Sequence, residues 1–158
     1  MSLIAALFAA AGVQAAPDPA VAEVTAVLDR LNQASSTGDG ATYFSLFTPD
    51  ARFVGTDAAE HWSMAEFRAF AEPYFRGGGV WSYPATERFI TIADIDCRCI
   101  AWFEEKLDNR KYGVTRGSGV MRKTADGWKI EQYVLSFAIP NDRSAAVVAA
   151  VRAPAHQG

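Results

Sequence analysis

The amino-acid sequence predicts an α+β fold, in which a curved antiparallel sheet wraps over N-terminal helices and leaves a cone-shaped interior. Apolar residues of the first half recur at spacings of three and four, as on one face of a helix. The last third instead reads as consecutive strands separated by tight turns. With 158 residues, half of them hydrophobic, the chain is long enough for one domain with a buried core.

The N-terminal segment, residues 1–15, is interpreted as a secretory signal peptide. Residues 2–11 form an apolar run that is too short to span a bilayer. Val13 and Ala15 fit the small-residue rule of signal peptidase, which places the mature start near Ala16. No Lys or Arg precedes the run, so a truncated start is expected. The alternative is a helical extension packed on the domain. We therefore expect a periplasmic or secreted protein, with residues 16–158 forming a single domain.

Two helices are predicted before the first strand. Asp18 can cap a helix that begins at Pro19, and Gly38 can end it. A second, short helix is predicted over residues 41–47, and a short strand over residues 51–54.

The third helix has the clearest start signal. Ser63 and Glu66 have the spacing of a capping box, and the apolar residues that follow recur at the helical period. The glycine triplet at residues 77–79 is predicted to end this helix. It neither follows a strand nor opens a helix, so a phosphate-binding loop is not predicted.

Four strands are predicted after the third helix. They cover residues 80–93, 97–107, 111–124 and 128–139. Pro84 indicates an edge position or a bulge in the first of them. The Ala- and Val-rich tail at residues 144–153 has a weak helical pattern.

Cys97 and Cys99 are the only cysteines of the chain. On a predicted strand, side chains two residues apart point to the same face. A metal site would need more ligands, and a disulfide between such close neighbours would be strained. The two residues are therefore interpreted as small, half-buried apolar side chains.

Several short motifs stand out along the chain. They are FVGTD at residues 53–57 with EHW at 60–62, AWF at 101–103, RGSGV at 116–120 and GWKI at 127–130. Together with the order of elements, these motifs resemble the nuclear transport factor 2-like (NTF2-like) superfamily and, within it, the SnoaL-like domains. The resemblance covers roughly residues 21–141.

This resemblance implies the cone-shaped fold, but it implies no single activity. The superfamily includes isomerases, dehydratases, epoxide hydrolases, polyketide cyclases and non-catalytic domains, and one fold commonly hosts many functions. Members with a Trp-x-Ile-x-His-x-His pattern carry histidines on the last strand, where this chain has Gln132 and Val134. Proton-transfer chemistry is therefore less expected on that strand.

The turns between the last strands decide which residues share a face. A three-residue loop at 125–127 pairs Thr124 with Trp128. A two-residue Asp-Gly loop would instead place the alternate side chains of these two strands on that face. With the three-residue loop, and a second one at 108–110, one patch is predicted to line the pocket. This patch consists of Trp102, Glu104, Arg116, Ser118 and Gln132.

Arg116 is the central residue of this patch. An unpaired charge buried among valines is costly, so Glu104 is the expected partner of Arg116. The pair would either hold the sheet together or bind a ligand, with Arg116 contacting a carboxylate or enolate oxygen while Glu104 orients it.

A second group of candidates precedes the third helix, near the expected mouth of the cone. Asp57 could act as a general base if burial raises its pKa, or it could be a turn residue bonded to nearby backbone. Glu60 and His61 are candidate ligand contacts, and His61 could transfer protons. Trp62 and Trp102 are expected in the core or the pocket wall.

Several functional classes lack their sequence signatures. The net charge of −3 and the absence of a Lys/Arg run argue against nucleic acid as a partner. Two histidines are too few for a multi-histidine metal site, and no dinucleotide, G-x-S-x-G or H-E-x-x-H motif is present. We expect no metal and no cofactor, so any catalysis would be acid–base chemistry.

Three functions remain open on the sequence. The first is binding of a small apolar or aromatic ligand. The second is a cofactor-free isomerase, dehydratase, cyclase or hydrolase with Asp57 as base and Arg116 as oxyanion partner, both facing one cavity. The third is a structural homodimer with a filled pocket, paired through an outer stripe of Tyr133, Leu135 and Phe137.

Overall fold

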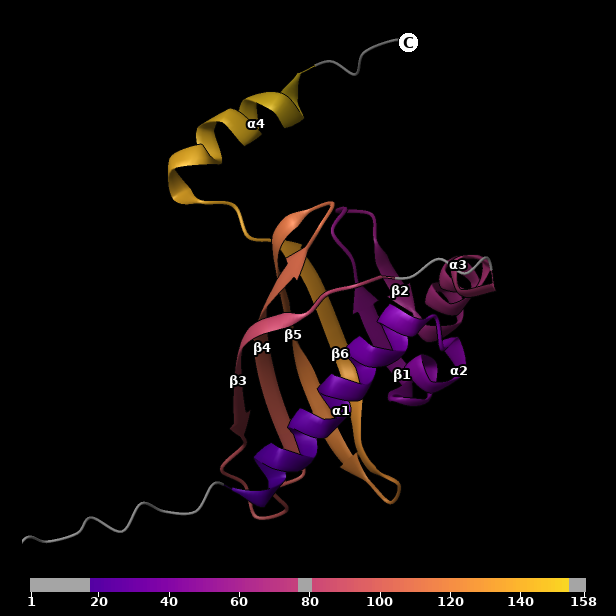
Figure 1. Cartoon of the computed structure of the whole chain (residues 1–158). Coiled ribbons are helices and arrows are strands. Elements are labelled where there is room, and N and C mark those ends of the chain that lie inside the picture. Colours follow the sequence, from indigo (N-terminus) through magenta and orange to yellow (C-terminus); the bar gives the residue numbers. More distant parts are fainter. Residues whose placement is uncertain (1–17, 77–80, 154–158) are drawn as a thin grey trace, which may run out of the picture.

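The computed structural model describes residues 18–76 and 81–153, and it has the predicted α+β architecture (Figure 1). The strands are β1 (Phe47–Val54), β2 (His61–Ser63), β3 (Ala85–Ile92), β4 (Ile100–Asn109), β5 (Gly113–Thr124) and β6 (Gly127–Phe137). The helices are α1 (Pro19–Thr37), α2 (Gly40–Ser45), α3 (Met64–Arg76), the 3₁₀ turn η1 (Asn141–Arg143) and α4 (Ser144–Arg152). The predicted signal peptide and glycine triplet lie outside the described residues.

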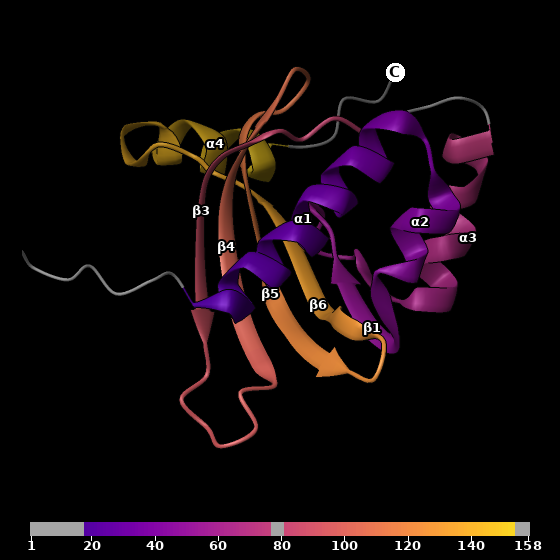
Figure 2. The same ribbon diagram turned by 60° about the horizontal axis from the view of Figure 1, so that its bottom comes forward.

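The six strands form one sheet with the order β2-β1-β6-β5-β4-β3. The predicted antiparallel arrangement holds except between β1 and β6, which run parallel. Helix α1 crosses one face of the curved sheet, and α2 and α3 lie beside β1 and β2 (Figures 1 and 2). We call the face covered by α1 the inner face and the opposite one the outer face. Helix α4 stands apart from the sheet in Figure 1.

Local chemistry fixes the helix ends as predicted. The Asp18 carboxylate accepts the backbone N–H of Ala20 at 3.0 Å, and Gly38 ends α1 with a φ of 73°. At the start of α3, the Ser63 N–H donates to the Glu66 carboxylate at 2.8 Å, and the Glu66 N–H donates back to the Ser63 hydroxyl at 3.3 Å. This reciprocal pair is the predicted capping box.

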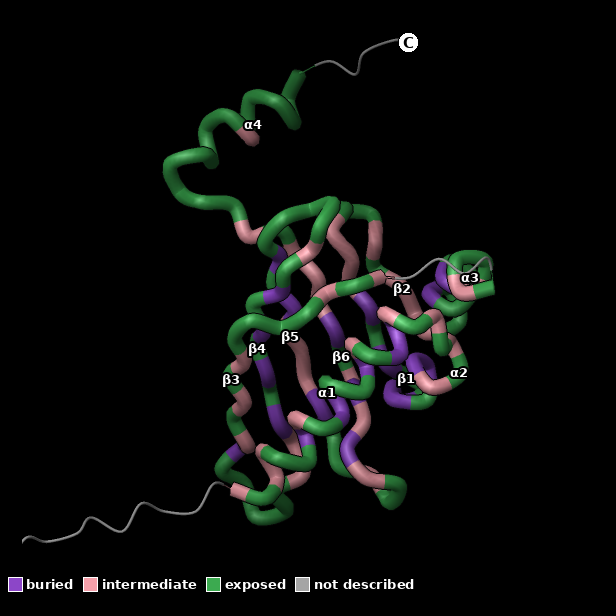
Figure 3. Tube along the Cα trace, viewed as in Figure 1, coloured by how far each residue is buried: buried purple, intermediate pink, exposed green. Residues whose placement is uncertain are grey.

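The core lies between the helices and the inner face of the sheet. Along β4 the tube in Figure 3 alternates between buried and exposed residues, as expected for a strand with one face toward the core. Leu28 from α1, Phe67 from α3 and Met121 and Ile130 from the sheet are almost completely buried. The core thus holds the helices at a fixed distance from the sheet.

The register between β5 and β6 differs from the prediction near the turn and agrees with it further on. Thr124 pairs with Gly127 rather than with Trp128. A β-bulge between Val120 and Met121 then shifts the pairing by one residue, so that Val120 pairs with Gln132. The predicted face therefore holds only beyond the bulge.

Two predicted strands begin later than expected. Pro84 lies just before β3, which is an edge strand as predicted, but β3 starts at Ala85 and not at residue 80. Strand β4 starts at Ile100 and not at Cys97, because residues 93–99 form a turn closed by the Ala93 N–H donating to the Ile100 carbonyl at 2.9 Å. No helix in the described part of the chain is long and apolar enough to cross a membrane.

Candidate functional site

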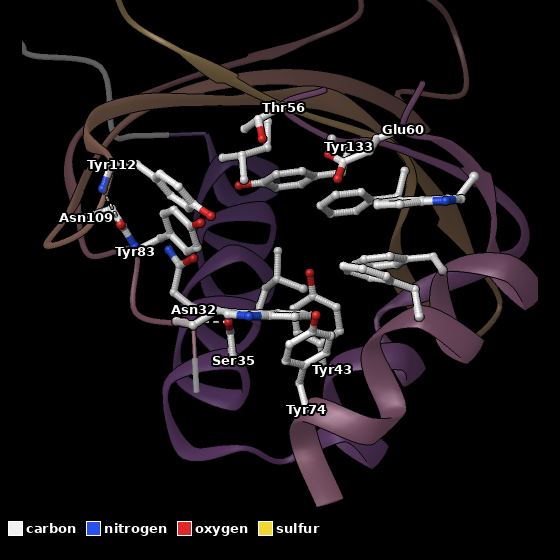
Figure 4. Close-up of a pocket in the computed structure, with 18 of the residues that line it drawn as sticks. Asn32, Ser35, Tyr43, Thr56, Glu60, Tyr74, Tyr83, Asn109, Tyr112 and Tyr133 are labelled. Atoms are coloured by element: carbon white, nitrogen blue, oxygen red, sulfur yellow. Dashed lines mark hydrogen bonds between the residues drawn. The ribbon is translucent and has the colours of Figure 1, made fainter. Parts of the chain in front are cut away.

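A cavity of about 340 Å³ lies between α1, α3 and the inner face of the sheet (Figure 4). Its wall comes from all three N-terminal helices, β1, β2 and the loop between them, the segment before β3, the β4–β5 turn and β6. Most elements of the fold thus contribute to one site.

One side of the cavity is a wall of nearly parallel aromatic rings. Phe53 stacks on Phe67 with 3.9 Å between ring centroids and 14° between planes. Trp62 stacks on Phe70 at 4.7 Å, and Trp81 lies within 17° of the plane of Phe70. All five rings line the cavity. Parallel ring faces favour a flat aromatic ligand, because aromatic pairs prefer offset-stacked or edge-to-face contacts.

All five tyrosines of the chain line this same cavity: Tyr43, Tyr74, Tyr83, Tyr112 and Tyr133. Burial raises the pKa of Tyr43, Tyr83 and Tyr133 above the ordinary value of 10. At neutral pH these phenols therefore stay protonated and can donate a hydrogen bond.

One end of the cavity is polar, where Tyr83 and Tyr112 gather with Asn32 and Asn109 (Figure 4). The side-chain oxygen of Asn109 accepts the backbone N–H of Tyr112 at 2.8 Å, and its NH₂ donates to the Ser82 carbonyl at 3.0 Å. These bonds tie the segment before β3 to the β4–β5 turn. They hold Tyr83 and Tyr112 at the same end.

Two glycines of β5 allow β6 and the Tyr133 ring to approach closely on the inner face, and Gly117 is the one that leaves room for the ring itself. A Cβ atom at Gly117 would lie 2.3 Å from the Tyr133 hydroxyl, and one at Gly119 would lie 2.0 Å from the Gln132 carbonyl. The RGSG motif of β5 therefore lets Tyr133 lie flat against the sheet at the cavity wall.

Glu60 is the only carboxylate among the described residues that line the cavity. Its side chain accepts the backbone N–H of Asp57 at 3.1 Å, and its own carbonyl accepts the N–H of Gly55 at 2.8 Å. A Cβ atom at Gly55 would lie only 2.1 Å from the Glu60 carboxylate. A tight loop between β1 and β2 thus holds this carboxylate in position.

Replacing Gly55 with alanine is expected to push Glu60 out of this position. The crowding should lower the free energy of unfolding by about 1–3 kcal/mol, the usual cost of overpacking, measured by urea denaturation. Glu60→Gln keeps the side-chain shape without the charge and serves as the control, which should cost less. If Gly55→Ala unfolds at the same urea concentration as the wild type, the loop does not hold Glu60 as described.

A buried ion pair lies between α1 and the sheet. The Glu105 carboxylate, on a residue 2% exposed, accepts a hydrogen bond from Nε of Arg88 at 2.7 Å, and Nη2 of Arg88 lies 2.7 Å from the same oxygen in an ion pair. Arg88 also bonds Asp29 of α1 at 2.7 Å. The second oxygen of Glu105 has no partner among the described residues, and burial raises the pKa of this carboxyl although Arg88 opposes the rise.

Two of the predicted site residues reach the cavity, namely Glu60 and Trp62. Asp57 does not line it: its carboxylate accepts the Ala59 N–H at 2.8 Å, which is the turn role considered above. His61 is exposed on β2 and does not line the cavity either.

The predicted patch exists, but it lies on the outer face. Glu104 pairs with Ser118 and Trp102 with Val120, so these side chains share a face with Arg116 and Gln132 as predicted. That face points away from α1, and none of the five patch residues lines the cavity. The expectation that Asp57 and Arg116 face one cavity is therefore wrong.

The buried ion pair of the sheet also differs from the prediction. Within residues 18–76 and 81–153, Arg116 and Glu104 form no ion pair, and both side chains are exposed. The buried partners are Arg88 and Glu105, one residue further along β4 and on the inner face. The prediction that a buried charge needs a partner holds for Arg88 and Glu105, but the predicted pair was assigned to the wrong face of the sheet.

Two further predictions need correction. Tyr133 is buried and Leu135 lines the cavity, so these residues do not form an outer stripe with Phe137. Cys97 and Cys99 are joined by a disulfide in the β3–β4 turn, and Cys97 is exposed. They are not half-buried apolar residues on a strand.

Sequence reasoning missed the tyrosine end of the cavity. Tyr83 lies in an irregular segment and Tyr112 in a turn. The alternation of side chains along a strand therefore could not predict whether either residue faces the interior. A signal was nevertheless present, because aromatic residues in irregular segments beside a predicted concave sheet are candidates for a pocket wall. In the described part of the chain, no group of three or more His, Cys, Asp or Glu side chains is arranged to hold a metal ion.

Comparison with known structures gives the same architecture. A proposed dehydratase of the NTF2-like family from Streptomyces avermitilis superposes with a TM-score of 0.66 at 16% identity, over 79% of this chain and 100% of that one. A proposed aromatic ring hydroxylase from Novosphingobium aromaticivorans gives 0.65 at 19% identity, over 79% and 93%. A Nostoc punctiforme domain of unknown function with a cystatin-like fold gives 0.65 at 15% identity, over 89% and 90%. At these identities the likeness establishes the fold alone.

Comparison at the level of sequence gives the family. No curated protein matches the chain. The sequence profile of the SnoaL-like domain matches residues 24–140, which include most of α1, the whole sheet and all the cavity-lining residues. The chain therefore belongs to the SnoaL-like domain family, within the NTF2-like fold.

Proposed function

We propose that the protein binds a small, flat aromatic ligand in the cavity between α1, α3 and the sheet. The observation that carries this proposal is the lining of the cavity. A wall of stacked aromatic rings and five tyrosines surround a cavity of about 340 Å³. Ligand pockets commonly measure roughly 300–1,000 Å³ and combine apolar walls with a few polar groups. The ring of the ligand would lie along the aromatic wall, with a polar substituent at the tyrosine end.

A thermal-shift experiment with a matched pair of ligands tests this proposal. 2-Naphthol is flat, whereas decahydro-2-naphthol has the same carbon skeleton and hydroxyl group but is not flat. We expect 2-naphthol to raise the melting temperature and the saturated alcohol to have a smaller effect, because a ligand that binds only the folded state stabilises it. The proposal fails if a broad panel of one- to three-ring aromatic compounds gives no stabilisation.

We also propose that the protein is exported to the periplasm or secreted. The apolar run at residues 2–11 and the small residues Val13 and Ala15 support this proposal. N-terminal sequencing of the protein expressed from its full gene tests it. A mature chain beginning near Ala16 is expected, and an unprocessed chain in the cytoplasm would contradict it.

An acid–base enzyme is the second candidate function, and Glu60 is the observation that favours it. This carboxylate is held at the cavity wall, opposite the hydroxyls of Tyr83 and Tyr112 (Figure 4). A carboxylate facing phenol donors could take a proton from a ligand while the phenols stabilise the oxygen that gains charge. The names of two similar structures, a proposed dehydratase and a proposed aromatic ring hydroxylase, are compatible with catalysis on such ligands. Glu60→Gln should abolish turnover of a bound ligand but keep its binding, whereas equal turnover would exclude Glu60 as base.

A homodimer through the outer face is a further proposal, with different residues from those first predicted. Phe89 and Trp102 lie on this face and are 62% and 49% exposed. Sedimentation equilibrium at micromolar concentration should give a dimer, and Trp102→Glu should shift it to a monomer because a charge would be buried at the contact. A wild-type monomer under these conditions would contradict the proposal.

A further inference from the structure

The disulfide between Cys97 and Cys99 lies in the β3–β4 turn, at the opposite end of β4 from the turn that lines the cavity. Strand β4 has 10 residues, and at about 3.3 Å per residue the two ends are roughly 30 Å apart. The β3–β4 turn lies beside the start of α1, where Arg98 pairs with Asp18 (Figures 1 and 2). The disulfide is therefore remote from the cavity.

A stabilising role does not account for this disulfide. The two cysteines are only two positions apart, so the bond closes a very short loop and removes little entropy from the unfolded chain. Backbone hydrogen bonds already shape the turn: the Arg98 N–H donates to the Ile95 carbonyl at 2.9 Å, and the Lys123 N–H donates to the Cys99 carbonyl at 2.7 Å. Because these bonds do not involve sulfur, the turn can keep its shape when the disulfide is reduced.

The two sulfur-bearing residues differ in their surroundings. Cys97 is exposed, whereas Cys99 is half-buried and its backbone is tied to β5 through Lys123. Thiol–disulfide exchange requires an incoming thiolate to approach one sulfur in line with the bond that breaks, so the more exposed residue, Cys97, is the one expected to be attacked. The anchored residue remains in place as the leaving group.

We propose that Cys97–Cys99 is a thiol–disulfide exchange site that accepts two electrons from external thiols. A thiolate attacks Sγ of Cys97; the bond between the two cysteines breaks, and Cys99 leaves as a thiolate and takes a proton. A second thiol then attacks the external sulfur of the mixed disulfide and releases Cys97, which also takes a proton. The external thiols lose two electrons and two protons and become a disulfide, and the cysteine pair gains both.

The test uses the full chain and two sources of thiol. The oxidised protein is mixed with reduced glutathione in one arm and with reduced, unfolded ribonuclease A in the other, and the thiols of Cys97 and Cys99 are counted by alkylation and intact mass. We expect reduction in at least one arm, re-formation of the bond with oxidised glutathione, and an unchanged circular dichroism spectrum. Reaction in one arm alone identifies a small thiol or a polypeptide dithiol as the partner. No reduction in either arm, or loss of the fold on reduction, overturns the proposal.

The order of attack has its own test. After reduction, iodoacetamide should modify Cys97 roughly tenfold faster than Cys99, since access controls the reactivity of a thiolate. Equal rates, or faster modification of Cys99, would overturn the assignment of Cys97 as the attacked residue. The double variant Cys97→Ser/Cys99→Ser should fold, should bind aromatic ligands like the wild type and should show no exchange in either arm.

Discussion

Replacing Arg88 with methionine is expected to lower the free energy of unfolding by about 3–5 kcal/mol, as is usual when one partner of a buried ion pair is removed. Arg88 forms the ion pair with the Glu105 carboxylate, which is 2% exposed on the face of β4 that packs toward α1. Without the guanidinium, Glu105 must either remain charged in an apolar site or take up a proton. Urea denaturation measures the loss.

Two control variants separate the buried charge from the loss of side-chain packing. Lys106→Met removes a partner of the Glu87–Lys106 pair, which also joins β3 to β4 but is about half exposed, and should cost less than about 1 kcal/mol. The double variant Arg88→Met/Glu105→Leu replaces both charges by apolar groups and should recover most of the lost stability. The explanation fails if Arg88→Met costs no more than Lys106→Met.

The same pair makes stability depend on pH in a defined direction. Burial raises the pKa of Glu105 above its ordinary value of 4.5, so the folded protein holds this proton to a higher pH than the unfolded chain. The stability that Glu105 contributes is complete below the pKa that this carboxyl has in the unfolded chain. It is lost as the pH rises through the pKa of Glu105 in the folded protein. Measured by urea denaturation across this range, the stability of the wild type relative to Glu105→Gln should fall with rising pH. A rise, or no change, would contradict the assignment.

Replacing Phe67 with alanine is the second change with a large expected effect. Phe67 is 2% exposed and stacks on Phe53 at 3.9 Å, so it belongs both to the core and to the aromatic wall. Truncating a buried phenylalanine costs about 3–5 kcal/mol, because apolar contacts are lost and a void remains. The same void enlarges the cavity, so the variant should bind larger flat ligands relative to small ones.

Phe70→Ala is the matched control, because Phe70 lies on the same helix and lines the same cavity but is 40% exposed. It should weaken aromatic binding with a much smaller loss of stability, since less apolar surface is returned to water. Thermal melts and ligand titrations of the two variants measure both effects. Equal losses of stability would show that Phe67 is not part of the core.

Local sequence signals predicted the helix ends and the order of the elements. The Ser63–Glu66 capping box and the Gly38 helix end depend on residues within a few positions of each other, and both are present. The bulge beside Val120 could not be predicted, because it depends on how β6 also pairs with β1 across the sheet. The candidate site failed for a related reason. The turn types correctly predicted that Trp102 and Arg116 share one face of the sheet. Which face becomes the inner one is decided by the packing of α1, and the turns carry no information about it.

The most direct test of ligand binding in the cavity uses the positions of the tryptophans. Trp62 and Trp81 line the cavity, whereas Trp102 lies on the outer face. In a Trp102→Phe variant, titration with 2-naphthol should change the tryptophan fluorescence in a saturable way, because the ligand stacks beside the two remaining cavity tryptophans. In a Trp62→Phe/Trp81→Phe variant, which keeps Trp102 and the buried Trp128, neither of them at the cavity, the signal should disappear. A signal that persists without Trp62 and Trp81, or no saturable signal in the first variant, would contradict binding in this cavity.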